Sequence, residues 1–406
     1  MAPAGNFECL RAAVQGGADS VYFGVGSLNM RSRSASNFTP EELPEVVRIC
    51  HEAGIKAYMT LNIALFETDL PDMRKALDAA KAAGVDAIIA SDIAAITYCR
   101  SIGLKVHIST QLSISNVEAV RFYAQFADVV VLARELDLEQ VKKISGAIRS
   151  EGIKGPSGDY VRIEMFAHGA LCMAISGKCY LSLHTTGSSA NRGECLQICR
   201  RGYEVTDLET GCKLNLDNRY IMSPKDLCTI EFLDKMADAG VSVLKIEGRA
   251  RSAEYVRRCA ECYRKAADAV CAGTYTPELA AALKESLAEV FNRGFWDGFY
   301  QGARLGEWSK VYGSDATMRK VYLGKVTNWF DRIDVAEVAV ETGDLVRGSR
   351  LMATGATTGV VEFHADDVRV NFEKCDVAPK GVHCSVAVPG ERLHRGDKIY
   401  LWEKRI

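Results

Sequence analysis

A group of cysteines near the middle of the chain carries the side chains best suited to chemistry. Cys172, Cys179, Cys195 and Cys199 follow one another in a glycine-rich stretch, and Cys228 comes soon afterwards. Glycines allow a backbone to wrap closely around a bound group. Four thiolates that converge on one point are the ligands of an iron–sulfur cluster, whereas structural zinc more often uses two short Cys-x2-Cys pairs. The irregular spacing of these cysteines therefore favours a cluster held by a loop.

Ordinary buried thiols and disulfides are the competing explanations for these cysteines. Free cysteine is among the most buried residue types, but these thiols lie among glycines and not on the apolar face of a helix. Disulfides are not expected, because the sequence opens without a secretory segment. The separate pair Cys259 and Cys262 recurs at helical spacing with apolar neighbours in residues 252–272, which predicts buried core thiols.

The elements that must position this loop lie in the first 250 residues, where short β-branched runs alternate with amphipathic helical ones. That alternation builds parallel sheets from βαβ units. Predicted strands cover residues 20–25, 56–62, 85–92, 105–111, 129–134, 162–168 and 241–247, with a stub at 1–4, and predicted helices include 40–53, 71–83 and 138–148. We therefore expect an α/β fold, a TIM-like (β/α)8 barrel over residues 1–250 with a cysteine-rich insertion at 169–228. The stub is short for a barrel strand, so we expect either an upstream translation start or an incomplete barrel.

Polar side chains gather where the predicted strands end, which is the active face of such barrels. They are Asn62, Asp92, Gln111, Arg134, Glu135 and His168. Each alone reads as a cap or loop anchor, but together they predict a polar pocket. Arg31 and Arg33 follow an early strand, in either a solvated loop or an anion site. The candidate substrate-binding residues are Asn62, Asp92, Gln111, Arg134, Arg31 and Arg33, and His168 and Glu164 are catalytic candidates.

Three charged residues alternate along the last predicted strand of the barrel. Lys245, Glu247 and Arg249 are spaced at i, i+2 and i+4, so they share one face of the strand. They form either a mutual ion-pair ladder or a site for an anionic ligand, in which Glu247 holds the two cations in place. A dicarboxylate or an RNA phosphate suits the two cations, because arginine binds such groups with two parallel hydrogen bonds. All three join the catalytic candidates.

The sequence changes character after the barrel. Residues 251–315 read as helices followed by a linker rich in Gly, Trp and Tyr, and residues 316–406 as short strands separated by turns. The latter pattern predicts a small β-barrel. A chain of 406 residues with 48% hydrophobic content is long enough for two such domains.

The charge and hydropathy of the chain limit its partners. A formal net charge of −2 provides no overall basic field, so an RNA site must be a local patch. No apolar run approaches the roughly 20 residues needed to span a bilayer. We expect a cytoplasmic protein with no membrane partner.

The stretch from Glu164 to Ser182 also carries a specific signature, Glu-x-Phe-x2-Gly-[Ser/Ala]-aliphatic-Cys-x4-Gly-x-Cys-x-aliphatic-Ser. It resembles the collagenase-like peptidase family U-32, and further matches at 2–6, 37–38, 223–227 and 245–249 extend the resemblance over nearly the whole chain. The resemblance implies hydroxylation of the wobble uridine of tRNA in a prephenate-dependent route, of a ribosomal RNA cytidine, or of ubiquinone precursors. The quinone-acting members carry a 4Fe-4S cluster, whose ligand pattern falls on Cys172, Cys179, Cys195 and Cys228, with Cys199 as a substitute.

The resemblance and the C-terminal domain select one functional hypothesis. Residues 316–406 are similar to the translation-factor-like barrel of the tRNA-acting members, so we expect 5-hydroxylation of the tRNA wobble uridine, with prephenate as a small anionic co-substrate. The anticodon loop is already single-stranded, which lowers the cost of extruding a base, and oxygen insertion needs a redox cofactor. The alternatives are a collagenase-like peptidase, in which His168 activates Cys172, and a non-catalytic tRNA-binding accessory that serves a partner enzyme.

Overall fold

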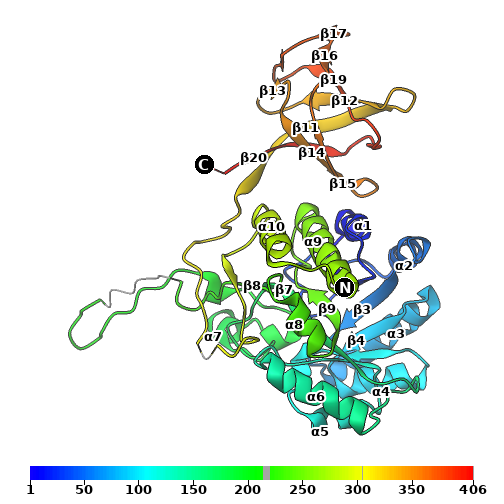
Figure 1. Ribbon diagram of the computed structural model, residues 1–406, viewed down its shortest axis with the longest axis vertical. Helices are drawn as coiled ribbons and strands as arrows, with labels where there is room; N and C mark the ends of the chain where they lie inside the picture. The colour runs from blue at the N-terminus through cyan, green and yellow to red at the C-terminus, as the bar shows by residue number, and fades with distance from the viewer. Residues whose placement is uncertain (214–219, 304, 406) are drawn as a thin grey trace.

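The computed structural model describes residues 1–213, 220–303 and 305–405. Its N-terminal part is built around parallel strands that pair in chain order from β1 to β7, and β9 pairs in parallel with β7 (Figure 1). Met1 links β9 to the first strand, because its backbone oxygen accepts from Ile246 N at 3.1 Å and its amino group donates to Leu244 O at 2.8 Å. These strands are β1 (Ala2–Ala4), β2 (Ser20–Gly24), β3 (Lys56–Leu61), β4 (Ala87–Ala90), β5 (Val106–Ile108), β6 (Val129–Val131), β7 (Arg162–Ala170) and β9 (Val241–Ile246). The predicted mixed α/β fold with a parallel sheet is confirmed, and the stub forms a strand paired with Val21–Phe23.

Helices alternate with these strands and turn an apolar face toward them. They are α1 (Phe7–Gln15), α2 (Leu43–Glu52), α3 (Leu70–Ala83), α4 (Ile93–Ser101), α5 (Val117–Tyr123), α6 (Leu138–Ser150), α8 (Leu233–Asp238), α9 (Ala253–Ala272) and α10 (Pro277–Ala288). Several begin at a side-chain cap; Asn6 Oδ1, for example, accepts from Cys9 N at 2.9 Å. As predicted, Cys259 and Cys262 are buried on α9.

An insertion after β7 interrupts the alternation and carries the cysteines. It includes the short helix α7 (Leu181–Thr186) and ends in β8 (Asp226–Cys228), which runs antiparallel to the end of β7. A two-residue strand, β10 (Phe295–Trp296), pairs in parallel with β8. Such short strands have no periodic pattern to detect in sequence, because their conformation is imposed by the strands beside them.

The C-terminal part is an antiparallel sheet with its own apolar core. Its strands are β11 (Met318–Phe330), β12 (Val335–Val340), β13 (Leu345–Val346), β14 (Arg350–Gly355), β15 (Gly359–His364), β16 (Val368–Val370), β17 (Glu373–Lys374), β18 (Val377–Ala378), β19 (His383–Ala387) and β20 (Lys398–Lys404). Eight of them form one sheet in the order β15-β14-β20-β11-β12-β19-β16-β17. The predicted second domain is thus present as an antiparallel sheet; pairing between its two ends, which a closed barrel requires, is absent among the described residues.

The C-terminal sheet packs on helices of the N-terminal part, and Figure 1 shows it standing over α1, α9 and α10. Gln15 of α1 hydrogen-bonds the backbone at the edge of the sheet: its amide donates to Thr358 O at 2.9 Å and accepts from Val360 N at 3.0 Å. Arg258 of α9 adds an ion pair with Glu362 at 2.8 Å. The two parts are therefore held together by specific backbone recognition as well as by apolar contact.

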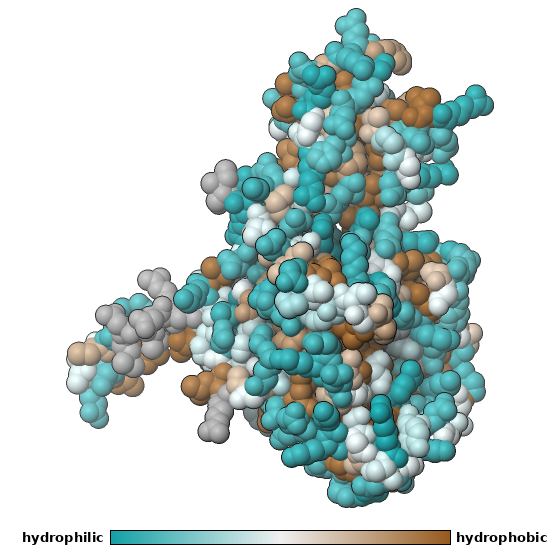
Figure 2. Space-filling view, viewed as in Figure 1, coloured by the Kyte–Doolittle hydropathy of each residue, from teal (hydrophilic) through white to brown (hydrophobic). Residues whose placement is uncertain are grey.

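Apolar side chains are gathered mainly in two cores, one inside each part of the chain. The face seen in Figure 2 is mostly hydrophilic, and apolar side chains appear on it in small separate groups. Among the described residues, no helix has both the length and the apolar character to cross a membrane.

Candidate functional site

A cavity of about 360 Å³ opens at the carboxyl ends of the parallel strands. Parallel strands end on the same side of a sheet, so the loops that follow them meet there. The candidate residues that line this cavity are Arg31, Asn62, Gln111, Arg134, Lys245, Glu247, Arg249, Cys172, Cys179, Cys195 and Cys199. The structure therefore brings most of the sequence-predicted site residues into one place.

Two of the candidate substrate-binding residues lie outside the cavity lining. Asp92 caps α4, because its Oδ1 accepts from Ala94 N at 2.9 Å and its Oδ2 from Leu65 N at 3.0 Å. Both of its oxygens hold backbone, and the side chain does not line the cavity. Arg33 is exposed at the edge of the cavity, where it donates to Ser188 Oγ at 3.1 Å.

Four thiols share the cavity wall. Cys172, Cys179 and Cys195 lie around Cys199, and the pKa of the Cys199 thiol is raised by burial, while Arg200 opposes that shift and the other three thiols add to it. Cys199 therefore lies within electrostatic reach of each of the other three thiols. The substitute ligand identified in the sequence, Cys199, thus belongs to the group.

Cys228, the fourth ligand that the resemblance implies, lies apart from the other thiols in this structure. It lies on β8 opposite His168 and is 2% exposed. Tyr263 Oη donates to its Sγ at 3.9 Å, and burial raises the pKa of the thiol to about 11. The antiparallel pairing of β8 with β7 turns this side chain into the apolar core, where the thiol stays protonated.

The thiols of the cavity suit an iron–sulfur centre in chemical type and in number. Positive charge favours thiolates, and the Arg31 and Arg200 guanidinium groups interact electrostatically with Cys195 and Cys199. Within the described ranges, no three Cys, His, Asp or Glu side chains are grouped closely enough to hold a metal ion. The donors therefore share one cavity, and a bound cluster requires the loop to bring their sulfur atoms together.

Glu247 is the acidic centre of the cavity floor. Its Oε1 accepts from Arg31 Nη2 at 2.6 Å and Nε at 3.2 Å, and its Oε2 accepts from Tyr22 Oη at 3.2 Å. Burial alone would raise the pKa of this carboxyl, but the charges of Arg31, Arg134 and Arg249 outweigh burial and lower it to about 2. Glu247 therefore remains ionised among the surrounding cations.

Lys245 and Arg249 find partners other than Glu247. Lys245 Nζ donates to Glu164 Oε1 at 2.7 Å, and both side chains are buried. Arg249 Nη1 donates to Asn29 Oδ1 at 2.8 Å and to Thr60 Oγ1 at 2.9 Å. The three alternating charges do share one face, as predicted. They form no ladder among themselves, because Lys245 is bound to Glu164, Glu247 to Arg31, and Arg249 to Asn29 and Thr60.

Arg134 is held differently from the other cations of the floor. Its guanidinium carbon lies 3.9 Å from the centroid of the Phe166 ring, and its Nη1 donates to Ala170 O at 3.3 Å. Its Nε is buried with no hydrogen-bond partner among the described residues. Arg134 is thus a cation with donors to spare on the wall of the cavity, as expected of a group that receives an anionic ligand.

His168 lies inside the core and not in the cavity. It is 1% exposed among the rings of Tyr255, Tyr263 and Phe295, and burial lowers its pKa to about 3. The imidazole is therefore neutral. It does not reach the cavity that Cys172 lines, so the predicted base for a cysteine nucleophile is missing from the site.

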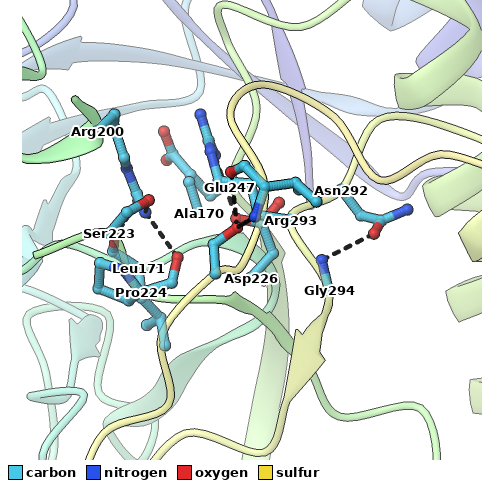
Figure 3. A network of polar contacts seen from close by, with 12 residues as sticks. Ala170, Leu171, Arg200, Ser223, Pro224, Asp226, Glu247, Asn292, Arg293 and Gly294 are labelled. Carbon is cyan, nitrogen blue, oxygen red and sulfur yellow. Dashed lines mark hydrogen bonds and ion pairs between the residues drawn. The ribbon is translucent and has the colours of Figure 1, made fainter. Parts of the chain in front are cut away.

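Arg200 is a residue of the site that the sequence did not single out. It donates to Leu171 O at 2.5 Å, to Pro224 O at 2.6 Å and to Ser223 Oγ at 3.1 Å, as Figure 3 shows. It thereby ties the segment after β7 to the segment just before β8, beside the Arg293–Asp226 ion pair at 3.3 Å. The conspicuous Ser-Pro-Lys-Asp stretch was the available signal, because it supplies two of the three acceptors, Ser223 Oγ and Pro224 O.

Comparison with known proteins gives the relatives of the chain. Residues 5–310 match the family model described as peptidase family U32. A Porphyromonas gingivalis protein named collagenase is 54% identical over 405 residues, which cover 100% of this chain and 98% of that protein. A Bacillus subtilis protein named tRNA hydroxylation protein P1 is 36% identical over 81% of this chain and 77% of its own length. An Escherichia coli enzyme named as a 23S rRNA 5-hydroxycytidine synthase is 34% identical over 66% of this chain and 39% of its own length.

Proposed function

The chain belongs to peptidase family U32, and from this premise we propose that it is an RNA-modifying enzyme that hydroxylates the wobble uridine of tRNA at position 5. Relatives named for tRNA and 23S rRNA hydroxylation support the class of reaction. The observation that carries the proposal is the cavity itself, which combines four thiols with several buried cations. Thiol ligands suit redox chemistry, and the cations suit an anionic co-substrate.

The cavity offers separate groups for the co-substrate and the base. The guanidinium of Arg134, which lines the cavity and stacks on Phe166, suits a carboxylate of a small anion such as prephenate. Asn62 donates to Gln111 Oε1 at 3.3 Å and so orients the Gln111 amide, whose Nε2 suits an acceptor on the edge of a uracil ring. Both groups line the same cavity, which supports this assignment.

Cys172, Cys179, Cys195 and Cys199 are the residues that would hold a 4Fe-4S cluster, which supplies electron-transfer chemistry when bound. The other side chains orient the ligands. Arg31 fixes the Glu247 carboxylate, and Glu164 fixes the ammonium group of Lys245 at the wall of the cavity. These fixed charges need no rearrangement when an anion enters.

The test is nucleoside mass spectrometry of tRNA from a strain that lacks the gene, complemented with variants of it. We expect 5-hydroxyuridine derivatives to return with wild type and with the core variant Cys259→Ala, and to stay absent with Cys172→Ser and Arg134→Ala. Protein purified without oxygen should hold close to four iron and four sulfide per chain, roughly one cluster. Unchanged tRNA in the deletion strain would contradict the proposal, and iron-free protein that binds tRNA would favour the accessory role.

A collagenase-like peptidase is the second candidate, favoured by the name of the relative at 54% identity. Against it, His168 is buried away from the cavity that Cys172 lines. Cleavage of gelatin by the pure protein, lost in Cys172→Ala and kept in Cys259→Ala, would favour the peptidase. Intact gelatin together with restored tRNA hydroxylation would exclude it.

A further inference from the structure

The edge of the cavity is built from two loops that lie against each other. Residues 25–39 follow β2, and residues 171–203 form the cysteine loop. Ser32 Oγ donates to Gly193 O at 3.0 Å, and Arg33 donates to Ser188 Oγ at 3.1 Å. We call the outer edge of these loops the rim; it includes Arg33, Met173, Ile175, Lys178 and Tyr180.

The rim exposes apolar and aromatic side chains beside the opening. Tyr180 is 76% exposed, Ile175 53% and Met173 40%. Tyr180 directly follows Cys179, whose side chain lines the cavity. Among the residues that the structure describes, no aromatic ring packs on that of Tyr180. An exposed ring at the mouth of a polar cavity offers a face on which another flat group can stack.

The two loops of the rim are also strongly basic for their length. They contain six Lys or Arg residues and a single acidic one, Glu194, whereas the whole chain has a net charge of −2; the six are Arg31, Arg33, Lys178, Arg192, Arg200 and Arg201. The C-terminal residues 316–406 are balanced by contrast, with fourteen Lys or Arg against thirteen Asp or Glu. Arg31 and Arg192 are ion-paired with Glu247 and Asp69, and Arg200 is bound to oxygens of the chain. The exposed positive charge of these loops therefore comes from Arg33, Lys178 and Arg201.

From this combination we propose that the rim binds single-stranded RNA, with the Tyr180 ring stacked on a base next to the one that enters the cavity. The proposal rests on the proposed function, since it assigns the surface that presents the substrate. Exposed rings interleaved with cations suit unpaired nucleotides, because their base faces are open and their phosphates are charged. In a duplex those faces are hidden, so the rim selects a loop.

The test measures the binding of a fluorescent 17-nucleotide anticodon stem-loop, about the size of one such hairpin, to the full-length protein, alongside a fully paired duplex of equal length. Tyr180→Ala should weaken stem-loop binding about 5- to 100-fold, the range that stacking on one base gives, while Tyr180→Phe should retain it. Lys178→Ala should lower the slope of log affinity against log salt by about 0.7. Phe372→Ala is the matched control, since this ring is 94% exposed but lies on the C-terminal sheet. Iron content is measured in each variant to verify that the loop is intact.

Each result bears on the proposal in a distinct way. If neither Tyr180→Ala nor Phe372→Ala changes stem-loop binding, the proposed RNA-binding role of the rim is overturned. This holds even where wild-type protein hydroxylates tRNA. Equal affinity for the duplex overturns the selection of unpaired bases. A Tyr180→Ala variant that loses gelatin binding and keeps stem-loop binding assigns the rim to a peptide and overturns the proposal. Loss of stem-loop binding in Tyr180→Ala, with iron content and Phe372→Ala unaffected, supports it whether or not hydroxylation is detected.

Discussion

Cys199 and Cys228 have different surroundings, although both were candidates for the fourth ligand of a cluster. Cys199 lines the cavity with the other three thiols, and Cys228 is buried on β8. Cys199→Ala should therefore remove most of the bound iron. Cys228→Ala should leave iron near the wild-type level and cost only packing, roughly 1 kcal/mol. Iron analysis and absorption spectra of protein purified without oxygen decide between them, and the reverse pattern would return Cys228 to the ligand set.

Glu247 neutralises a group of buried cations, so its charge matters to stability. Glu247→Gln leaves Arg31 and Arg249 without a full counter-charge and should lower the free energy of unfolding by about 3 kcal/mol. The folded pKa of about 2 lies below the ordinary 4.5. The carboxylate therefore stabilises the fold above about pH 4.5, and this contribution is lost as the pH falls toward 2.

Urea unfolding between pH 7 and pH 3 checks this expectation. Wild type should lose stability more steeply below pH 4.5 than Glu247→Gln, because the variant has no carboxylate to protonate at this site. Glu285→Gln is the control, since Glu285 is exposed on α10. A pH dependence of Glu247→Gln that matched wild type would contradict the assignment.

At the scale of elements, the end of β7 depends on one glycine. Gly169 has a φ of 105°, and a Cβ there would lie 2.4 Å from Glu247 O. Gly169→Ala should cost roughly 2–4 kcal/mol, because both the backbone conformation and the approach of β9 are disturbed. Gly187→Ala is the control: its φ is 71°, but a Cβ there meets nothing within 4 Å, so about 1 kcal/mol is expected. Urea unfolding measures both, and equal costs would show that the close approach is unimportant.

The main elements of the ring were predictable, because β-branched runs and amphipathic helices alternate over many residues. The sequence did not predict β8, nor did it predict which residues pair with Lys245 and Arg249 in the cavity. A strand of three residues has too little pattern to detect, and its pairing with β7 decides that Cys228 points inward. Asp92 carried a readable signal, an aspartate just before a helix, which predicts a cap more directly than a substrate contact.

The whole molecule relies on Gln15 to join its two parts. Gln15→Ala leaves the N–H of Val360 and the carbonyl of Thr358 without their partner, which should cost roughly 1–3 kcal/mol at the junction. We expect faster proteolytic release of the C-terminal sheet and a lower unfolding midpoint. Gln125→Ala, at an exposed position, is the control. Identical proteolysis of the two variants would mean that the other contacts, such as the Arg258–Glu362 ion pair, hold the parts together without Gln15.

The link between Met1 and β9 has a consequence for synthesis on the ribosome. The two segments that complete the ring are separated by 243 positions in the chain. Proteins are made from the N-terminus, and contacts between distant segments form late. β1 pairs with β2 as soon as that strand has been made, but the side of the first strand that meets β9 stays open until β9 has emerged. The nascent chain exposes this apolar surface during most of its translation. A chaperone that binds unfolded chains would therefore have its largest effect in this interval.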